Sequence, residues 1–139
     1  MSEPFEIIEH TADIGFRASG ATPAELFENA AQAMMSIAAD IDAIQPARDI
    51  RISVEAGDYP DLLVNWLSEI LYLFDSGRLA PAGFHVAEIT PVHLRAVVRG
   101  EPREGGQHPW KLIIKAVTYH EIEVAERNGR WECKVYLDI

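Results

Sequence analysis

Two aspartates near opposite ends of the chain have the surroundings of metal ligands. Asp13 follows the segment His10–Ala12 at a polar break between two apolar stretches. Asp138 is the penultimate residue, so its side chain lies next to the main-chain carboxylate of Ile139. Clustered carboxylate oxygens suit hard cations such as Ca²⁺, Mg²⁺ or Mn²⁺. An aspartate after a strand is also a common turn residue, and spacing alone does not bring Asp13 to Asp138.

Two further ionisable side chains have unusual surroundings. Glu69 lies on an almost wholly apolar helical stretch, one turn after Asn65. Such a glutamate either points to solvent at the edge of the helix or serves a site. His120 ends the segment Lys115–His120 (KAVTYH), and the strand pattern directs it to the core side, where a hydrogen-bonded buried histidine is the simpler interpretation.

The sequence motifs of common enzyme classes are missing. The chain has no GxSxG, no HExxH, no dinucleotide-binding fingerprint and no phosphate-binding loop. The five histidines are scattered, without the tight His/Cys spacing of a zinc site. Cys133 is the only cysteine and is predicted to be buried and structural. This pattern favours a protein that assists another macromolecule over a self-sufficient enzyme.

Composition limits the partners and the location. Twelve Lys and Arg against 22 Asp and Glu give a net charge of −10, which repels phosphate backbones and anionic lipids. We therefore expect a basic protein partner or a hard cation rather than strong direct nucleic-acid binding. No stretch approaches the ~20 apolar residues of a membrane span. One unpaired thiol and a terminus without a basic signal-peptide region predict a cytoplasmic protein; the oligomeric state is not predicted.

The hydrophobic periodicity predicts one α+β domain over residues 1–139, with two helices and a mostly antiparallel sheet. Thr22-Pro23-Ala24-Glu25 has the features of a capped helix start, and a second helix is expected from residues 58–61 to about Asp75. Strands are predicted at residues 5–9, 14–18, 50–56, 85–89, 93–99, 111–117, 121–127 and 130–137. Residues 100–109, which include His108, are predicted to form an exposed, mobile loop.

Asn128-Gly129 predicts a two-residue hairpin with a type I′ turn. In that hairpin, the residue numbers of any two facing residues add up to 257. If this register continues beyond the hairpin and the strand does not bulge, residues 115–120 lie beside the C-terminus. The predicted pairs are Glu123–Lys134, Ile122–Val135, Val124–Cys133, Tyr119–Asp138 and Thr118–Ile139.

Four segments together resemble the archease family. They are residues 10–16 (HTADIGF), 61–69 (DLLVNWLSE), 115–120 (KAVTYH) and 135–139 (VYLDI). They occur in the family's order, and the likeness covers essentially the whole chain. The resemblance implies a small α+β fold of the strand-helix-strand-strand type.

The resemblance also implies a function and a site. Archeases are protein cofactors of the RtcB-type RNA ligase, which joins RNA ends in tRNA splicing and RNA repair with GTP and divalent metal. They promote guanylylation of the ligase and its repeated turnover without ligating RNA themselves. The family's metal site falls on Asp13, Asp138 and the carboxylate of Ile139, with Ca²⁺ as the expected ion and Mg²⁺ or Mn²⁺ as alternatives. A lysine needed for function falls on Lys115.

The sequence also offers further candidate contact residues and two alternative functions. Thr118, Tyr119, His120, Glu69 and His10 are candidate contacts with a partner. One alternative is a metal-dependent hydrolase, in which the two aspartates and a histidine position an activated water. The other alternative is a general chaperone or small-ligand module with no enzyme partner.

Overall fold

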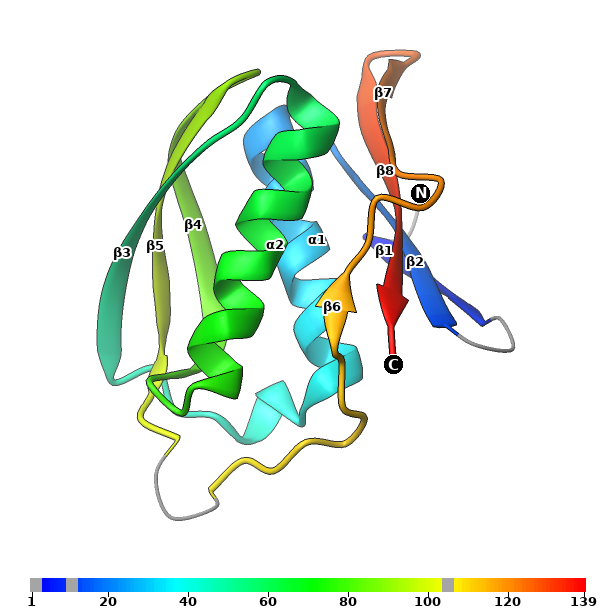
Figure 1. Ribbon diagram of the computed structural model, residues 1–139. Helices are drawn as coiled ribbons and strands as arrows, with labels where there is room; N and C mark the ends of the chain where they lie inside the picture. Colours follow the sequence, from blue (N-terminus) through cyan, green and yellow to red (C-terminus); the bar gives the residue numbers. More distant parts are fainter. Residues whose placement is uncertain (1–3, 10–12, 104–106) are drawn as a thin grey trace.

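Two antiparallel sheets enclose a pair of helices in the computed structural model, which describes residues 4–9, 13–103 and 107–139 (Figure 1). The buried apolar side chains form one core between these layers. In chain order the elements are β1 (Phe5–Glu9), β2 (Asp13–Gly20), α1 (Pro23–Ala38), the 3₁₀ helix η1 (Ile41–Ala43), β3 (Arg48–Glu55), α2 (Tyr59–Asp75), β4 (Ala80–Thr90), β5 (His93–Glu101), β6 (Ala116–Val117), β7 (Glu123–Arg127) and β8 (Arg130–Asp138).

The strands divide into a five-stranded and a three-stranded sheet. The larger has the order β1-β2-β8-β6, with β7 also paired to β8, and the smaller has the order β3-β5-β4. Every strand pair in both sheets is antiparallel. The predicted α+β class with antiparallel pairing is thus confirmed, and the division into two sheets is what the sequence pattern did not reveal.

Helix α1 begins as its sequence predicts. The Thr22 hydroxyl oxygen accepts a hydrogen bond from the Glu25 N–H at 3.1 Å, and the Glu25 carboxylate accepts one from the Ala21 N–H at 3.0 Å. The first of these bonds satisfies an N–H group that the first turn of a helix leaves without a partner, and the second joins the residue before the cap to that turn. The helix buries residues on more than one face, including Ala31 and Met35, because it contacts both β2 and β4.

Helix α2 begins at an aspartate cap and crosses the middle of the molecule. The Asp58 carboxylate accepts a hydrogen bond from the Asp61 N–H at 3.0 Å. Trp66 is fully buried, and its indole N–H donates to the Phe27 carbonyl at 2.9 Å, which joins α2 to α1. Glu69 is exposed on this helix, so the solvent-facing interpretation of this residue is correct.

The hairpin between β7 and β8 forms in the predicted register. Asn128 and Gly129 have φ angles of 53° and 78°, the left-handed values that a type I′ turn needs. Glu123 pairs with Lys134 and Val124 pairs with Cys133. Cys133 is buried, as predicted, and burial raises the pKa of its thiol to about 12.

The predicted strand over residues 111–117 is wrong except at its end. Only Ala116–Val117 forms a strand, because residues 111–114 run past the end of α1 without a strand partner. The Lys111 N–H donates instead to the Ala38 carbonyl at 2.7 Å. Ala116 then pairs with Asp138, so the predicted pairs Tyr119–Asp138 and Thr118–Ile139 are wrong: the chain makes a turn after β6, where Glu121 has a φ of 49°.

The prediction of an exposed loop over residues 100–109 is only partly correct for its described part: Gln107 and Pro109 are exposed, but the other described residues are not. Gly100 and Glu101 are the last residues of β5. The Arg103 guanidinium lies 4.2 Å from the centre of the Phe74 ring and also donates to the Phe74 carbonyl. The His108 side chain is only 14% exposed and forms an ion pair with Glu101. The Arg103 contacts hold one end of the segment against α2, and the contact with Glu101 holds His108 against the end of β5.

Among the described residues, α1 and α2 are the long helices, and neither combines the length and apolar character needed to cross a membrane.

Candidate functional site

Pairing of β2 with β8 brings the two aspartates of the sequence prediction together. Asp13, the first residue of β2, lies directly opposite Asp138, the last residue of β8. Side chains directly opposite each other on antiparallel strands have Cβ atoms roughly 4.5–5.5 Å apart. Two carboxylates, 125 positions apart in the chain (138 minus 13), therefore face each other at one end of the five-stranded sheet.

The alternation of side chains shows which face of the sheet carries this pair. Ile14 and Leu137 pair with each other and are buried against the helices. Since successive side chains of a strand point to opposite faces, Asp13 and Asp138 lie on the face turned away from the helices. Asp138 is exposed and Asp13 is half-buried.

Tyr136 and Gly15 form the next pair on the same outer face. A Cβ atom on Gly15 would lie 2.7 Å from two carbon atoms of the Tyr136 ring. The ring therefore covers the strand at the position where only glycine leaves room for it. This close approach is the structural reason for a glycine two residues after Asp13.

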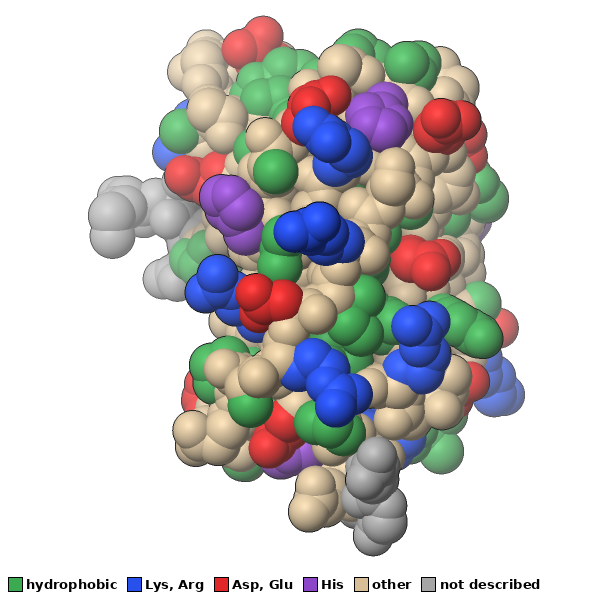
Figure 2. All heavy atoms as spheres, turned by 90° about the vertical axis from the view of Figure 1, so that its left-hand side faces the viewer, with side chains coloured by type: hydrophobic (Ala, Val, Ile, Leu, Met, Phe, Trp, Pro, Cys, Tyr) green, Lys and Arg blue, Asp and Glu red, His purple; other side chains and the backbone are tan. Residues whose placement is uncertain are grey.

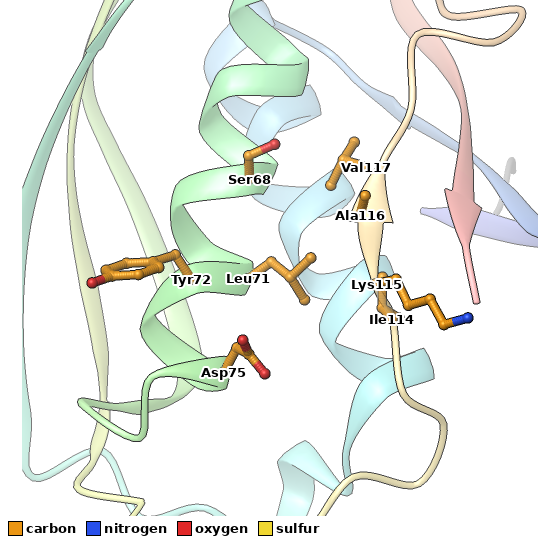
Figure 3. Close-up of a pocket in the computed structure, with 8 residues that line it drawn as sticks. All are labelled: Ser68, Leu71, Tyr72, Asp75, Ile114, Lys115, Ala116 and Val117. Atoms are coloured by element: carbon orange, nitrogen blue, oxygen red, sulfur yellow. The ribbon is translucent and has the colours of Figure 1, made fainter.

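The main chain of Lys115 meets Asp138 from a third part of the chain. Its N–H donates to the Asp138 carbonyl at 2.7 Å, at the start of the short pairing of β6 with β8. Figure 3 shows its side chain projecting away from α2, toward the end of β8. The prediction that the segment 115–120 lies beside the C-terminus is confirmed for Lys115.

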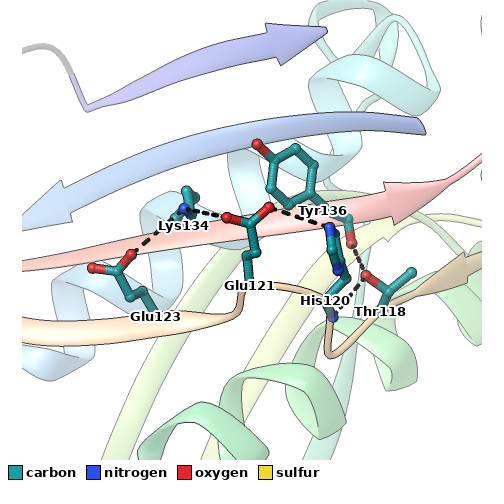
Figure 4. Close-up of polar contacts among 6 residues, drawn as sticks. All are labelled: Thr118, His120, Glu121, Glu123, Lys134 and Tyr136. Atoms are coloured by element: carbon teal, nitrogen blue, oxygen red, sulfur yellow. Dashed lines mark hydrogen bonds and ion pairs between the residues drawn. The ribbon is translucent and has the colours of Figure 1, made fainter. Parts of the chain in front are cut away.

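A polar cluster covers β8 next to the carboxylate pair (Figure 4). Lys134 lies 3.5 Å from a carboxylate oxygen of Glu121 and 3.6 Å from one of Glu123. Glu121 also forms an ion pair with His120 at 3.2 Å, and the His120 ring lies 5.6 Å from that of Tyr136. Because these side chains surround Tyr136, they form a charged rim next to Asp138 on the outer face.

His120 does not point to the core, as the register predicted. Its side chain is 66% exposed, because the turn around Glu121 breaks the register on which that prediction depended. Thr118 is half-buried and holds this turn: its hydroxyl donates to the Tyr136 carbonyl at 3.0 Å and accepts from the His120 N–H at 3.3 Å.

Tyr119 extends to the beginning of α2 instead of to Asp138. Its hydroxyl donates to the Asp61 carboxylate at 2.6 Å. This hydrogen bond, with a second one from the Gly57 N–H, lowers the pKa of Asp61. The same bond raises the pKa of Tyr119. Tyr119 therefore links the turn after β6 to α2. Among the described residues, neither Tyr119 nor Glu69 forms a hydrogen bond or ion pair with Asp13 or Asp138.

The donor set around Asp13 and Asp138 fits a hard cation only in part. Carboxylate oxygens are the ligands that Ca²⁺ and Mg²⁺ prefer, and the main-chain oxygens of Ile139 follow directly on Asp138. Within residues 4–9, 13–103 and 107–139, no three His, Cys, Asp or Glu side chains gather as a metal site. A cation here needs main-chain oxygens or water besides the two aspartates. His10 lies outside the described residues.

Three residues of this region were not predicted from the sequence to belong to it: Tyr136, Lys134 and Glu121. The period of two along β8 places Lys134, Tyr136 and Asp138 on one face, so two of the three follow from the pattern once Asp138 is taken as a site residue. Glu121 could not be found in this way, because its place depends on the turn.

The outer face of the three-stranded sheet carries a second group of charged side chains (Figure 2). Arg95 forms an ion pair with Glu88, and Arg99 forms one with Asp49 at 3.4 Å. The charges of these two arginines are thus offset by neighbouring carboxylates.

A model of the Archease protein family (MTH1598/TM1083) matches residues 5–139. The chain belongs to the archease family. Protein archease of Methanopyrus kandleri is 37% identical over 98% of this chain and 99% of its own length. Protein archease of Methanosarcina mazei is 38% identical over 100% of this chain and 98% of its own length.

Two solved structures have the same fold. The solution structure of protein 1598 of Methanobacterium thermoautotrophicum has a TM-score of 0.83 at 33% identity, over 98% of this chain and 99% of that one. The crystal structure of a Thermotoga maritima archease, described as a possible chaperone, has a TM-score of 0.67 at 23% identity, over 100% of this chain and 98% of that one. The archease fold thus extends over essentially the whole chain.

Proposed function

We propose that this archease-family chain is a non-enzymatic protein cofactor of an RtcB-type RNA ligase. In this role it binds a divalent cation and promotes guanylylation and repeated turnover of the ligase in tRNA splicing and RNA repair. The observation that supports the proposal most is the position of Asp13 opposite Asp138, with the Lys115 N–H bonded to the Asp138 carbonyl. The resemblance of these residues to the family's motifs supplies the reaction.

The energetics of the aspartate pair favour a bound cation. Like charges directly opposite each other on neighbouring strands are destabilising, and this chain places two at the end of a sheet. A divalent cation held by Asp13, Asp138 and the main-chain oxygens of Ile139 would offset their repulsion. We propose Ca²⁺ as the resident ion, with Mg²⁺ or Mn²⁺ as alternatives, because all three prefer oxygen ligands.

The net charge supports a basic protein as the partner. A charge of −10 speeds encounter with a positively charged surface and opposes strong direct binding to RNA or to an anionic membrane. A ligase that handles RNA ends presents such a surface. The proposal includes a cytoplasmic location, which the unpaired, buried Cys133 supports.

The chain's own residues have separate roles in this proposal. Asp13 and Asp138 hold the cation at an exposed end of the sheet. Lys115 carries a mobile positive charge beside them and contacts the ligase or its nucleotide. Tyr136 covers Gly15 and keeps the end of β2 and β8 rigid, so that the two carboxylates enter the partner's cleft already positioned.

The test is ligation by the purified host ligase at a concentration well below that of the RNA. With the wild-type chain we expect the product to exceed one molecule per ligase, and with Asp138→Ala we expect it to stay near one. Asp42→Ala, which removes an exposed acidic residue of η1, is the matched control and should activate like the wild type. Equal product with and without the wild-type chain would refute the proposal.

A general chaperone is the second candidate function. Large apolar side chains are exposed on the described surface, including Tyr72 at 57% and Ile113 at 59%, and exposed apolar groups are what chaperones use to hold clients. The Thermotoga maritima relative is described as a possible chaperone. This candidate predicts that the chain suppresses aggregation of unrelated heated proteins equally well with and without Asp138→Ala.

A further inference from the structure

The outer face of the three-stranded sheet is hollowed over its middle. Ala96 and Val98 of β5 belong to the buried core, so the alternation of side chains turns Val97, which lies between them, to the outer face. A hollow of about 320 Å³ is lined by Val97 together with Arg51, Ser53, Ala87 and Arg95. A second hollow of about 340 Å³ is lined by Gly83, Phe84, His85 and Arg99. Because Val97 and His85 are paired across β5 and β4, the two hollows adjoin.

Four side chains with basic groups surround Val97, and they are called the basic ring below: Arg51, His85, Arg95 and Arg99. Arg51 of β3 and His85 of β4 pair with Val97 on its two sides. Arg95 and Arg99 precede and follow it by two residues on β5, so they share its face. Figure 2 shows Lys and Arg side chains spread over this face, with small side chains and backbone between them. Three of the chain's 12 Lys and Arg residues thus surround one apolar side chain, in a molecule with a net charge of −10.

The protein's own carboxylates hold the arginines of the basic ring only loosely. Among the described residues, Arg51 has no ion pair and no side-chain hydrogen bond. Arg95 pairs with Glu88 and Arg99 with Asp49, and the side chains of both pairs are 48–60% exposed. Ion pairs this exposed contribute little to stability, so an anionic ligand can take the place of these carboxylates.

The chemistry of the basic ring fits phosphate groups. Arginine forms two parallel hydrogen bonds to a phosphate, and its flat guanidinium group also stacks on other planar groups. The hollows lie on an open sheet face, which suits an extended chain, whereas small molecules bind in enclosed pockets. Single-stranded RNA binds to such surfaces with its phosphates on basic side chains and its bases stacked on flat ones.

An acidic protein segment would also pair with the arginines, but the shape of this face favours RNA. Gly83, Ala87 and Val97 leave the middle of the face without long side chains, so flat bases have room beside the guanidinium groups. Two adjoining hollows next to the arginines match the alternation of base and phosphate along a strand.

We propose that the basic ring binds single-stranded RNA. The guanidinium groups of Arg51, Arg95 and Arg99 bind its phosphates, and bases lie in the hollows over Val97 and beside Gly83. The net charge of −10 repels RNA from the molecule as a whole, so the affinity is low and the contact matters where a strand is already held nearby. The inference goes beyond the proposed function, which leaves the RNA to the ligase: the chain touches RNA with one sheet, while the other sheet carries Asp13 and Asp138.

Fluorescence anisotropy with a labelled oligouridine tests the proposal on the full-length chain, without ligase. With an oligonucleotide of about 12 residues at about 20 mM salt, we expect a Kd of about 100 µM, within the range of non-specific binding. Arg51→Gln should weaken binding about tenfold and reduce the slope of log affinity against log salt by about 0.7, the effect of losing one phosphate contact on a single strand. Arg48→Gln is the matched control, because Arg48 is an exposed arginine of the same strand on its other face. It should bind like the wild type.

A second variant and an NMR titration locate the bound strand. Ala87→Glu places a carboxylate in the first hollow, at an exposed position, and should weaken binding at least as much as Arg51→Gln. The methyl signals of Ala87 and Val97 should shift as oligouridine is added. The methyl signal of Ala116, exposed on the other sheet, should not.

Three results would each overturn the inference. The first is no binding by the wild type at protein concentrations well above the expected Kd. The second is equal weakening by Arg51→Gln and Arg48→Gln, which would reflect only the total charge. The third is competition by an oligoglutamate of the same length as effective as that by unlabelled oligouridine, since the face would then receive an acidic protein segment. Because no ligase is present, all three leave the proposed function untouched.

Discussion

Neutralising one carboxylate of the facing pair should change stability in opposite directions with and without a cation. In the presence of a chelator, Asp13→Asn and Asp138→Asn remove a like-charge repulsion across β2 and β8, so each variant should melt at or slightly above the temperature of the wild type. With Ca²⁺ the order should reverse, because each variant has lost a ligand. Asp42→Asn on η1 is the control and should follow the wild type in both conditions.

The size of the cation effect follows from linkage and chain length. A ligand at about 100 times its Kd stabilises the folded state by about 2.7 kcal/mol. At about 2.1 cal/mol/K per residue, the 139 residues give an unfolding entropy of about 0.3 kcal/mol/K. The wild-type melting temperature should therefore rise by about 9 °C. A variant that binds about a hundredfold more weakly is then only half saturated, which leaves a stabilisation of about 0.4 kcal/mol and a rise of about 1 °C.

Differential scanning calorimetry in EDTA and then in excess Ca²⁺, Mg²⁺ or Mn²⁺ measures these shifts and ranks the three ions. The reasoning is refuted if the wild type and both variants respond equally to every ion. It is also refuted if the variants melt well below the wild type in EDTA, since the two aspartates would then stabilise the sheet without a cation.

Three other perturbations test separate features of the structure. Gly15→Ala places a Cβ 2.7 Å from the Tyr136 ring and should lower the free energy of unfolding by about 1–3 kcal/mol, measured by urea denaturation. Tyr119→Phe removes the main cause of the lowered pKa of Asp61, so the Asp61 carboxyl should titrate at higher pH by NMR. Because a lowered folded-state pKa gives stability that is lost as the pH falls through it, this variant should also lose less stability on acidification than the wild type. Cys133, buried and with a pKa of about 12, should react with a disulfide reagent at neutral pH only at the rate of global unfolding.

Local chemistry made much of the fold predictable. The threonine cap and glutamate of α1 and the aspartate cap of α2 act on N–H groups within four residues. The Asn128-Gly129 turn fixes the register of the β7–β8 hairpin on its own. In each case the residues that decide the structure are neighbours in the chain, so the sequence contains the whole interaction.

The parts that depend on distant pairing were not predictable in the same way. Residues 111–114 alternate like a strand but meet no partner strand, and a strand needs one. The paired numbers sum to 257 in the β7–β8 hairpin and to 254 where Ala116 meets Asp138, so three extra residues are accommodated by the turn around Glu121. A glutamate with a positive φ is uncommon, and the wrong positions of Tyr119 and His120 both follow from this turn.

The facing aspartates were also only partly predictable from the sequence. Their types and flanking residues identify Asp13 and Asp138 as potential cation ligands, but only the pairing of β2 with β8 makes them neighbours. That pairing depends on burying Ile14 against Leu137 and Phe16 against Val135 in one core. The facing position of the two aspartates is thus a consequence of pairing between strands from opposite ends of the chain.

Guanylylation of the ligase, measured directly, tests the central claim. The purified RtcB-type ligase is incubated with labelled GTP and divalent metal, without RNA, and covalent label on the ligase is followed over time. The account predicts faster labelling with the wild-type chain, no acceleration with Asp13→Asn or Asp138→Asn, and full acceleration with Asp42→Asn. Labelling that is equally fast with the wild type, with the aspartate variants and without the chain would contradict it.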